Sequence, residues 1–119
     1  MTTKQIANRL VELCREGEFE KAQKELFSDS AISIEPEASH GFDKETKGLN
    51  KIIEKGHKFQ SMIKEAHGST VSDPIVTDNC IAFGLNMDLT MKDRGRTKMG
   101  EVCLYKVKDG KIVSEQFFM

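Results

Sequence analysis

The sequence predicts an α+β fold in which three N-terminal helices pack on the concave face of a curved antiparallel sheet. Two observations carry this prediction. Apolar residues recur at helical spacing in the first part of the chain and again after Gly48. From Ile81 to Met91 they alternate strictly with small or polar residues, the pattern of a strand with one buried face. Because the helices precede most of the strands, helices and sheet are expected to form separate layers.

Two helices are predicted at the start of the chain. The first begins after a weak capping box at Thr2 and ends at Gly17. The second occupies the charged segment 18–27 and follows almost without a loop. In both segments apolar residues recur every three or four positions, namely Ile6, Leu10 and Leu13 in the first and Phe19, Ala22 and Leu26 in the second.

The middle of the chain predicts a short strand, a loop and a third helix. Residues 28–30 separate the second helix from a strand over 31–36, which ends at Pro36 because proline cannot donate to a ladder. The polar residues 37–47 are expected to form a loop. A third helix then ends near Lys64, as indicated by the helical spacing of Leu49, Ile52, Ile53, Phe59 and Ile63.

The remainder of the chain predicts a meander of antiparallel strands separated by polar turns. The basic segment 92–98 is interpreted as a solvated hairpin tip, because Asp, Arg and Gly at its centre favour a turn. The other turns are expected at 78–79 and 108–110, and the strands at 67–74, 80–91, 97–107 and 111–119.

Length and composition limit the classes of function. The 119 residues, 38% hydrophobic and 31% charged, suit one globular domain over residues 1–119. No stretch approaches the about 20 apolar residues of a membrane span, so we expect no membrane partner and a cytoplasmic location. The 18 basic residues are matched by 19 acidic ones, which argues against a nucleic-acid partner. The 3 cysteines stand at unpaired spacings and are expected to be reduced and buried.

The sequence contains none of the common motifs for phosphate binding, serine hydrolases or zinc proteases. It has no glycine-rich phosphate loop, no G-x-S-x-G and no H-E-x-x-H. Its histidines, His40, His57 and His67, are scattered and lack a paired cysteine. We therefore expect no metal and no cofactor.

Three glutamates in apolar company are the candidate catalytic residues. Glu101 and Glu115 interrupt otherwise apolar strand faces, and Glu35 ends a strand beside the long polar loop. A glutamate on a core-facing side has its pKa raised by lost hydration and can act as a general acid or base near neutral pH. The alternative is that each faces water or forms an ion pair with a lysine or arginine.

The turn at 108–110 decides whether Glu101 and Glu115 lie on one face of the sheet. A two-residue type I′ turn would pair Leu104 with Glu115 and place Glu101 on the opposite face. A three-residue loop would pair Cys103 with Glu115 and place Glu101 diagonally beside it. Of these two registers only the second creates a shared carboxylate site, and it is the one we favour.

Large side chains near the glutamates allow two interpretations. Phe59, Phe83, Met87 and Tyr105 either line a cavity or form plain core. Tyr105 is the only tyrosine, and its hydroxyl needs a partner if it is buried.

Three local strings resemble the nuclear-transport-factor-2-like superfamily, in particular its SnoaL-like and ketosteroid-isomerase-like branches. They are Leu-Phe-Ser-Asp-Ser-Ala at 26–31, Ile-Glu-Pro at 34–36, and the segment 105–113 around Asp-Gly-Lys-Ile. The resemblance covers essentially the whole chain and implies a cone-shaped sheet. The superfamily includes isomerases, cyclases, dehydratases, hydrolases and non-catalytic binders, so the resemblance specifies fold better than activity.

The resemblance also implies roles for individual residues. The proton-shuttling base of the isomerases falls on Glu35. Their two oxyanion-hole donors do not survive, because the tyrosine falls on Leu10 and the protonated aspartate on Cys103, with Glu101 two residues earlier on the same face. A true ketosteroid isomerase activity is therefore not expected.

The same resemblance implies a ligand pocket and a dimer. Besides the glutamates, it places Leu85, Met87, Cys103, Tyr105 and Phe117 in the pocket. Phe59, one of the large side chains named above, is expected there as well. The outer face of the sheet, with Asn86, Asp88 and Thr90, is expected to belong to a homodimer interface.

The leading hypothesis is a protein that binds a small apolar or amphipathic molecule, with isomerase or cyclase chemistry by Glu35 assisted by Glu101 or Glu115. The alternative is a non-catalytic ligand-binding or dimerisation module of the same fold, with exposed or ion-paired carboxylates and no cavity beside them. A third hypothesis is a hydrolase or dehydratase that positions a water with His67 and Glu115.

Overall fold

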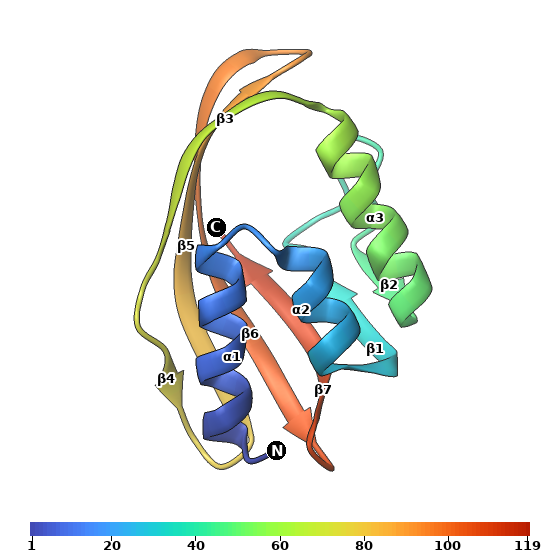
Figure 1. The fold of residues 1–119 in the computed structure, drawn as a ribbon. Helices are drawn as coiled ribbons and strands as arrows, with labels where there is room; N and C mark the ends of the chain where they lie inside the picture. Colours follow the sequence, from blue (N-terminus) through green and yellow to red (C-terminus); the bar gives the residue numbers. More distant parts are fainter.

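A computed structural model describes residues 1–119 and confirms the α+β fold class (Figure 1). The helices lie together on one side of a curved sheet. The elements are, in chain order, α1 (Thr3–Arg15), α2 (Phe19–Leu26), β1 (Phe27–Ile34), β2 (Glu45–Lys47), α3 (Leu49–Ser61), β3 (Ile63–Val71), β4 (Ile75–Val76), β5 (Cys80–Met91), β6 (Gly95–Lys108) and β7 (Lys111–Phe118).

The sheet is mixed and unclosed. Its strand order is β2-β1-β7-β6-β5-β3, with β4 pairing β5 outside this path. The antiparallel meander holds from β3 to β7, as the sequence predicts. The exception is β1, which runs parallel to β7. The last strand of the chain therefore lies beside the first, and this pairing builds the centre of the site described below.

Several element boundaries differ from the prediction. The strand predicted at 67–74 is β3 over Ile63–Val71, followed by the short strand β4, and β1 ends at Ile34 rather than at Pro36. β1 begins at Phe27, directly after α2, so that the polar residues 28–30 belong to the strand, where its pairing with β7 shifts. Residues 45–47, predicted as loop, form the edge strand β2, because their backbone pairs with the end of β1. The third helix ends at Ser61 rather than near Lys64, and β3 follows almost at once. In each case backbone pairing with a distant segment overrides the local side-chain pattern.

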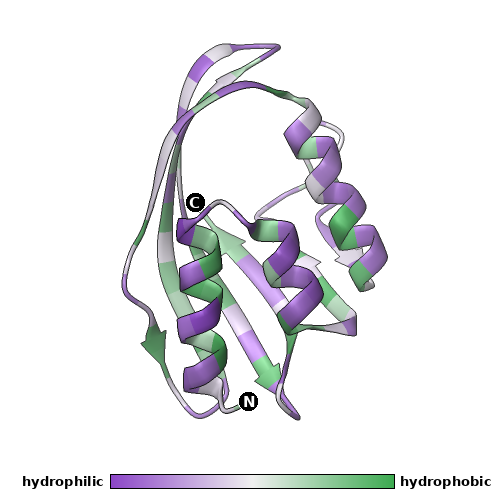
Figure 2. Ribbon diagram, viewed as in Figure 1, coloured by the Kyte–Doolittle hydropathy of each residue, from purple (hydrophilic) through white to green (hydrophobic).

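The core lies between the sheet and the helices, with most of its helical residues from α1 and α2 and Ile52 from α3. α1 is held at its start by the predicted capping box of Thr2 and Gln5. Its apolar stripe faces the sheet, and Figure 2 shows hydrophobic and hydrophilic positions alternating around the helices. The fully buried residues of this core include Ile6, Leu13, Ala31, Ile52, Ile81 and Ile112.

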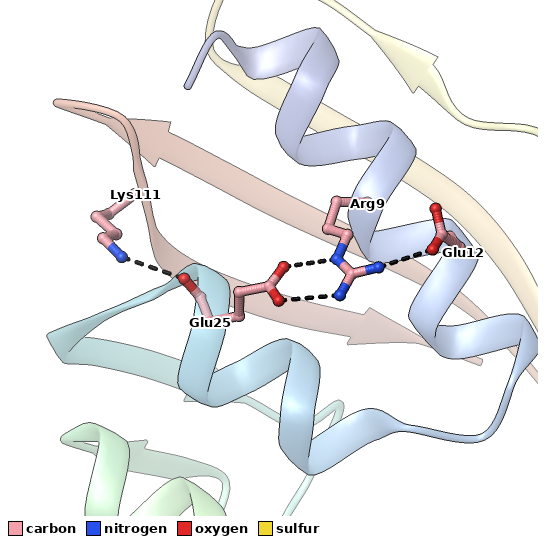
Figure 3. A network of polar contacts seen from close by, with 4 residues as sticks. All are labelled: Arg9, Glu12, Glu25 and Lys111. Atoms are coloured by element: carbon pink, nitrogen blue, oxygen red, sulfur yellow. Dashed lines mark hydrogen bonds and ion pairs between the residues drawn. The ribbon is translucent and has the colours of Figure 1, made fainter.

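Polar contacts on the surface link α1, α2 and β7 (Figure 3). The guanidinium of Arg9 donates two hydrogen bonds to Glu25, of 2.6 and 3.0 Å, and one of 2.7 Å to Glu12. Lys111 donates to the carbonyl oxygen of Glu25 at 3.1 Å. The first two helices are thereby fixed over one part of the sheet, while α3 covers another part.

The hairpin of β6 and β7 combines features that the sequence presents as alternatives. Asp109 and Gly110 both have positive φ, 52° and 74°, as a two-residue type I′ turn requires. A register shift between Lys106 and Val107 then moves the pairing by one residue, so that Tyr105 pairs with Glu115. Neither register predicted for Glu115 is therefore correct. This register shift, a β-bulge, nevertheless places Glu115 on the face of the sheet that the favoured register predicted.

Candidate functional site

Two neighbouring strands, β1 and β7, bring Ser33 and Glu115 together. The residues pair directly across the parallel strands β1 and β7. Both are buried, Ser33 fully and Glu115 to within 4% exposure. The Ser33 hydroxyl donates a hydrogen bond of 2.7 Å to Oε1 of Glu115. A serine and a glutamate 82 positions apart in the chain thus form one buried polar pair.

Lys55 on α3 extends this pair into a chain of contacts. Its Nζ donates to Ser33 Oγ at 2.6 Å and to Oε1 of Glu35 at 2.9 Å. Because an ammonium group cannot accept, Ser33 accepts from Lys55 and gives its own hydrogen to Glu115. The side chains of Lys55 and Glu35 are 14% and 24% exposed. No buried side-chain nitrogen or oxygen lacks a hydrogen-bond partner.

Opposing effects act on the Glu115 carboxyl group. Loss of hydration raises its pKa to about 6. The hydrogen bond from Ser33 and the charge of Lys55 oppose this increase, and the charge of Glu35 adds to it. Glu115 is therefore mainly ionised at neutral pH although it is buried, because Ser33 and Lys55 compensate part of its lost hydration.

Glu101 faces the same side of the sheet from β6. It is half-buried, and its one hydrogen-bond contact is weak, the Cys103 thiol donating to Oε1 at 3.8 Å. Burial raises the pKa of Glu101 to about 7, with the charges of Glu35 and Glu115 as further causes. Both protonation states are therefore present at neutral pH, which suits a general acid or base.

The structure thus brings the three predicted glutamates near one another on the inner face. The charges of Glu35 and Glu115 both act on Glu101, and the interpretation that all three face bulk water does not hold. Glu35 does form the ion pair that was considered as an alternative, with Lys55 as its partner. We refer to Ser33, Glu35, Lys55, Glu101 and Glu115 as the inner-face cluster.

Sequence reasoning missed Lys55 and Ser33. A signal for each exists. Ser33 stands two residues before Glu35, at the end of β1, and Lys55 follows Ile52 by three residues on the inward stripe of α3. A serine and a lysine at such positions are common, however, and neither pattern specifies a contact between a helix and a distant strand.

The helix that carries Lys55 is held over the cluster largely by polar contacts. Ile52 is the only residue of α3 that is fully buried. His57 contacts Glu20 of α2, and the Lys58 Nζ lies 4.8 Å from the ring centroid of Phe42. The position of Lys55 therefore depends on one fully buried apolar anchor, on the partly buried Leu49, which packs against the same core, and on several surface contacts.

The six predicted pocket residues divide into two groups. Leu85, Cys103 and Tyr105 are buried within the hydrophobic core. Phe59, Met87 and Phe117 are partly buried, and the ring centroid of Phe117 lies 5.7 Å from the Lys55 Nζ. Phe117 is therefore the predicted pocket residue that the structure places against the charged cluster.

Tyr105 packs as a core aromatic residue. Its ring stacks on Phe83 with centroids 5.4 Å apart and meets the edge of Phe27 at 6.3 Å. Burial raises its pKa well above the ordinary value, so the phenol is neutral across the physiological range. The ring fixes the β6 backbone two residues from Cys103 and opposite Glu115.

Two surface hollows lie away from the inner-face cluster. One of about 380 Å³ lies between α1 and the start of β4, and one of about 320 Å³ lies beside β2. None of the predicted catalytic or pocket residues lines either hollow. The first is lined by Asn8, Val11, Glu12, Arg15, Glu16, Asp73 and Pro74, and the second by Asp43, Glu45, Thr46, Lys47 and Lys51.

His67 and Glu115 do not lie together. His67 Nε2 is 2.6 Å from the Thr90 hydroxyl, whereas Glu115 is buried on the inner face with Ser33.

No three side chains of the His, Cys, Asp and Glu types group closely enough to hold a metal ion. The cysteines are all free, and Cys80 is half-buried while the other two are buried.

A comparison with protein-family models matches a SnoaL-like domain over residues 1–119, the whole described chain. The chain belongs to the SnoaL-like family. The family resemblance of the sequence strings is thereby confirmed. No curated protein matches the sequence.

Solved structures support the same assignment for this SnoaL-like chain. A Mesorhizobium loti protein described as a SnoaL-like polyketide cyclase is 33% identical, with a TM-score of 0.91 and full coverage of both chains. A Xanthomonas campestris protein of unknown function with a cystatin-like fold is 21% identical, with a TM-score of 0.82 over 99% of this chain and 90% of its own.

A third similar structure has a ketosteroid-isomerase-like fold. This Catenulispora acidiphila protein, crystallised with trimethylamine, is 14% identical, with a TM-score of 0.73 over 99% of this chain and 87% of its own. The two less identical structures show the cystatin-like and isomerase-like fold of this SnoaL-like chain, not an activity. None of its helices is long and apolar enough to cross a membrane.

The SnoaL-like chain departs from the isomerase pattern where an oxyanion would bind. Leu10, on which the sequence resemblance places the isomerase tyrosine, is 2% exposed and belongs to the core. Burial raises the pKa of the Cys103 thiol, with Glu101 as the next cause, so this weak donor stays neutral. Glu35 has the carboxylate that the resemblance implies for the base, and this carboxylate forms an ion pair with Lys55.

Proposed function

We propose that this SnoaL-like protein binds a small apolar or amphipathic molecule at the inner-face cluster and moves a proton on it, as an isomerase or cyclase does. The observation that carries the proposal is the unequal surroundings of three carboxyl groups on one face. Glu35 is ion-paired, Glu115 is buried behind Ser33, and Glu101 is half-buried without a strong partner. Carboxyl groups in unequal surroundings can divide the roles of acid and base.

We assign the proton transfer to Glu101, with Glu35 as the second acid or base. In its ionised form Glu101 takes a proton from a carbon next to a carbonyl group, and the C–H electron pair becomes that of an enolate. In an isomerase the proton then returns to another carbon. In a cyclase the enolate carbon forms a bond to a second carbonyl carbon, the C=O π electrons move to that carbonyl oxygen, and the oxygen takes the proton from Glu101 to become a hydroxyl group. Neither route consumes an oxidant or a cofactor. The description of the 33% identical relative names a SnoaL-like polyketide cyclase, followed in brackets by carbohydrate phosphatase, and the first of these names supports this reaction class.

The proton transfer can be tested with 2-tetralone, an aromatic ketone with acidic C–H bonds beside its carbonyl group. We expect the wild-type protein to accelerate deuterium exchange of these hydrogens, followed by NMR in D2O. The rate should rise as the pH passes about 7, where Glu101 becomes ionised. Glu101→Gln should lose about 10²-fold or more of the rate.

Two further variants make this test specific. Glu54→Gln, at an exposed position of α3, should keep the wild-type rate and profile. Glu35→Gln should keep a rise near pH 7, because Glu101 remains. Loss of exchange in Glu35→Gln with an unchanged rate in Glu101→Gln would show that the base is Glu35, against our assignment.

A non-catalytic binding or dimerisation module is the second candidate. It is favoured by the hydrogen bonds that already occupy Glu35, Ser33 and Glu115, and by the distance of both surface hollows from them. The absence of any wild-type exchange over the pH range 5–9 would favour this candidate.

We also propose a homodimer through the outer face of the sheet. Val102 and Phe118 pair directly across β6 and β7, and their exposure of 51% and 48% is high for large apolar residues. We expect Val102→Lys to shift a dimer to monomers in analytical ultracentrifugation. The control Ala66→Lys, on the edge strand β3, should leave the wild-type mass unchanged. A monomeric wild-type protein would contradict the proposal.

A further inference from the structure

The proposed reaction places negative charge on a substrate oxygen, and this charge needs a donor. When a proton leaves a carbon beside a carbonyl group, the electrons move to the carbonyl oxygen, and donors aimed at that oxygen lower the barrier. The positions that carry these donors in the isomerases hold Leu10 in the core and the weak donor Cys103. Another group of this chain must therefore supply the stabilisation.

Lys55 is the one cation within the inner-face cluster, and its ammonium group is not fully used. Of its three N–H donors, two bind Ser33 and Glu35. The ammonium group also lies over the ring of Phe117, 5.7 Å from its centroid, and the side chain of Lys55 is 14% exposed. A carbonyl oxygen that replaces the contact with the Phe117 ring would receive one charged N–H, while the hydrogen bonds to Ser33 and Glu35 stay in place.

We propose that Lys55 binds the carbonyl oxygen of the substrate and stabilises the enolate, and that the substrate is a neutral amphipathic ketone or related carbonyl compound. This inference rests on the proposed function and deepens it. Lys55 is then a catalytic residue that touches the reacting group. Ser33 and Glu115 are positioning residues, because they hold the ammonium group from behind through the hydrogen bonds of 2.6 and 2.7 Å.

The charges around Lys55 favour a neutral substrate. Glu35 contacts the ammonium group directly, Glu115 acts on it through Ser33, and Glu101 faces the same side of the sheet. A substrate carboxylate would meet these acidic groups with a single lysine to balance them, and like charges at close range repel. A ketone enters uncharged and becomes negative only in the transition state, when the Lys55 contact gains strength.

The infrared carbonyl band of bound 2-tetralone tests this contact directly. A hydrogen bond from an ammonium group weakens the C=O bond, so we expect the band in the wild-type complex at lower frequency than in an apolar solvent. Subtracting the spectrum of the ¹³C-carbonyl form isolates this band. In Lys55→Met the shift should be lost and the deuterium exchange should fall about 10²-fold or more.

Two matched variants complete the experiment. Lys51→Met removes a lysine from the exposed side of α3 and should keep both the band shift and the exchange rate. Lys55→Arg retains the charge and should keep part of the shift, which covers the case that Lys55→Met does not fold. An unshifted band in the wild type, an unchanged shift in Lys55→Met, or no binding of 2-tetralone would each overturn the proposal.

The outcome also separates this inference from the proposed function. A shift that depends on Lys55, without any deuterium exchange, would support the contact and contradict the proton transfer. Exchange that depends on Glu101 but is unchanged in Lys55→Met would support the proton transfer and overturn the role of Lys55.

Discussion

The Glu101→Gln variant is expected to be more stable than the wild type at pH 8, by about 3 kcal/mol, and about equally stable at pH 4. Glu101 has a pKa of about 7 in the folded protein against 4.5 as its ordinary value. Between these values the folded state binds a proton that the unfolded state has lost, so the free energy of unfolding decreases as the pH rises. Glutamine is neutral throughout and does not incur this loss.

Urea unfolding of both proteins at pH 4, 6 and 8 measures the effect. The stabilisation of Glu101→Gln should increase over this range and level off above pH 7. Glu54→Gln, at an exposed position, should follow the wild-type curve at every pH. Equal stabilities of Glu101→Gln and the wild type at pH 8 would mean that the Glu101 carboxylate is well hydrated in the folded protein. If Glu101→Gln is more stable than the wild type and has also lost activity, the carboxyl group proposed for catalysis lowers the stability of the folded protein.

Ile52→Ala is expected to lower the free energy of unfolding by about 2–5 kcal/mol and to loosen α3 before the rest of the protein. Ile52 is fully buried and is the only such residue of its helix. Its side chain therefore provides the main apolar contact by which α3 is fixed over the sheet. The helix also carries Lys55, so the same substitution should weaken the proposed substrate contact.

Hydrogen exchange of the α3 amides measures the local part of this effect, and urea unfolding measures the global part. Ile53→Ala is the matched control, because Ile53 has the same shape in the same helix but is only half-buried. It should cost clearly less free energy of unfolding. Equal protection of the α3 amides in Ile52→Ala and Ile53→Ala would contradict the role of Ile52 as the anchor.

Periodicity in the sequence was sufficient to predict most of the fold. The helical spacing before Gly17 and the alternation from Ile81 to Met91 each report one buried face, which is a local property of the chain. The strand β2 was not predictable in this way, because its three residues, 45–47, carry no apolar pattern. Its formation depends on an edge that β1 offers from elsewhere in the sequence.

The site was predictable in part for a similar reason. Each glutamate was identified by apolar neighbours in its own strand. The partners of Glu35 and Glu115 come from other elements, Lys55 from a helix and Ser33 from the first strand. The face of Glu115 depends on a bulge that no turn residue indicates. Contacts between elements and irregular pairing are set by tertiary packing, which local patterns do not encode.

The parallel pairing of β1 with β7 makes assembly of the inner-face cluster a late event in folding. Ser33 and Glu35 lie in the first third of the chain, whereas Glu101 and Glu115 lie in its last twenty residues. Contacts of such long sequence separation have a high loop-closure cost and form slowly. During synthesis, α1, α2 and β1 leave the ribosome well before β7, so the buried polar groups of the cluster meet only when the last strand has been made and docked.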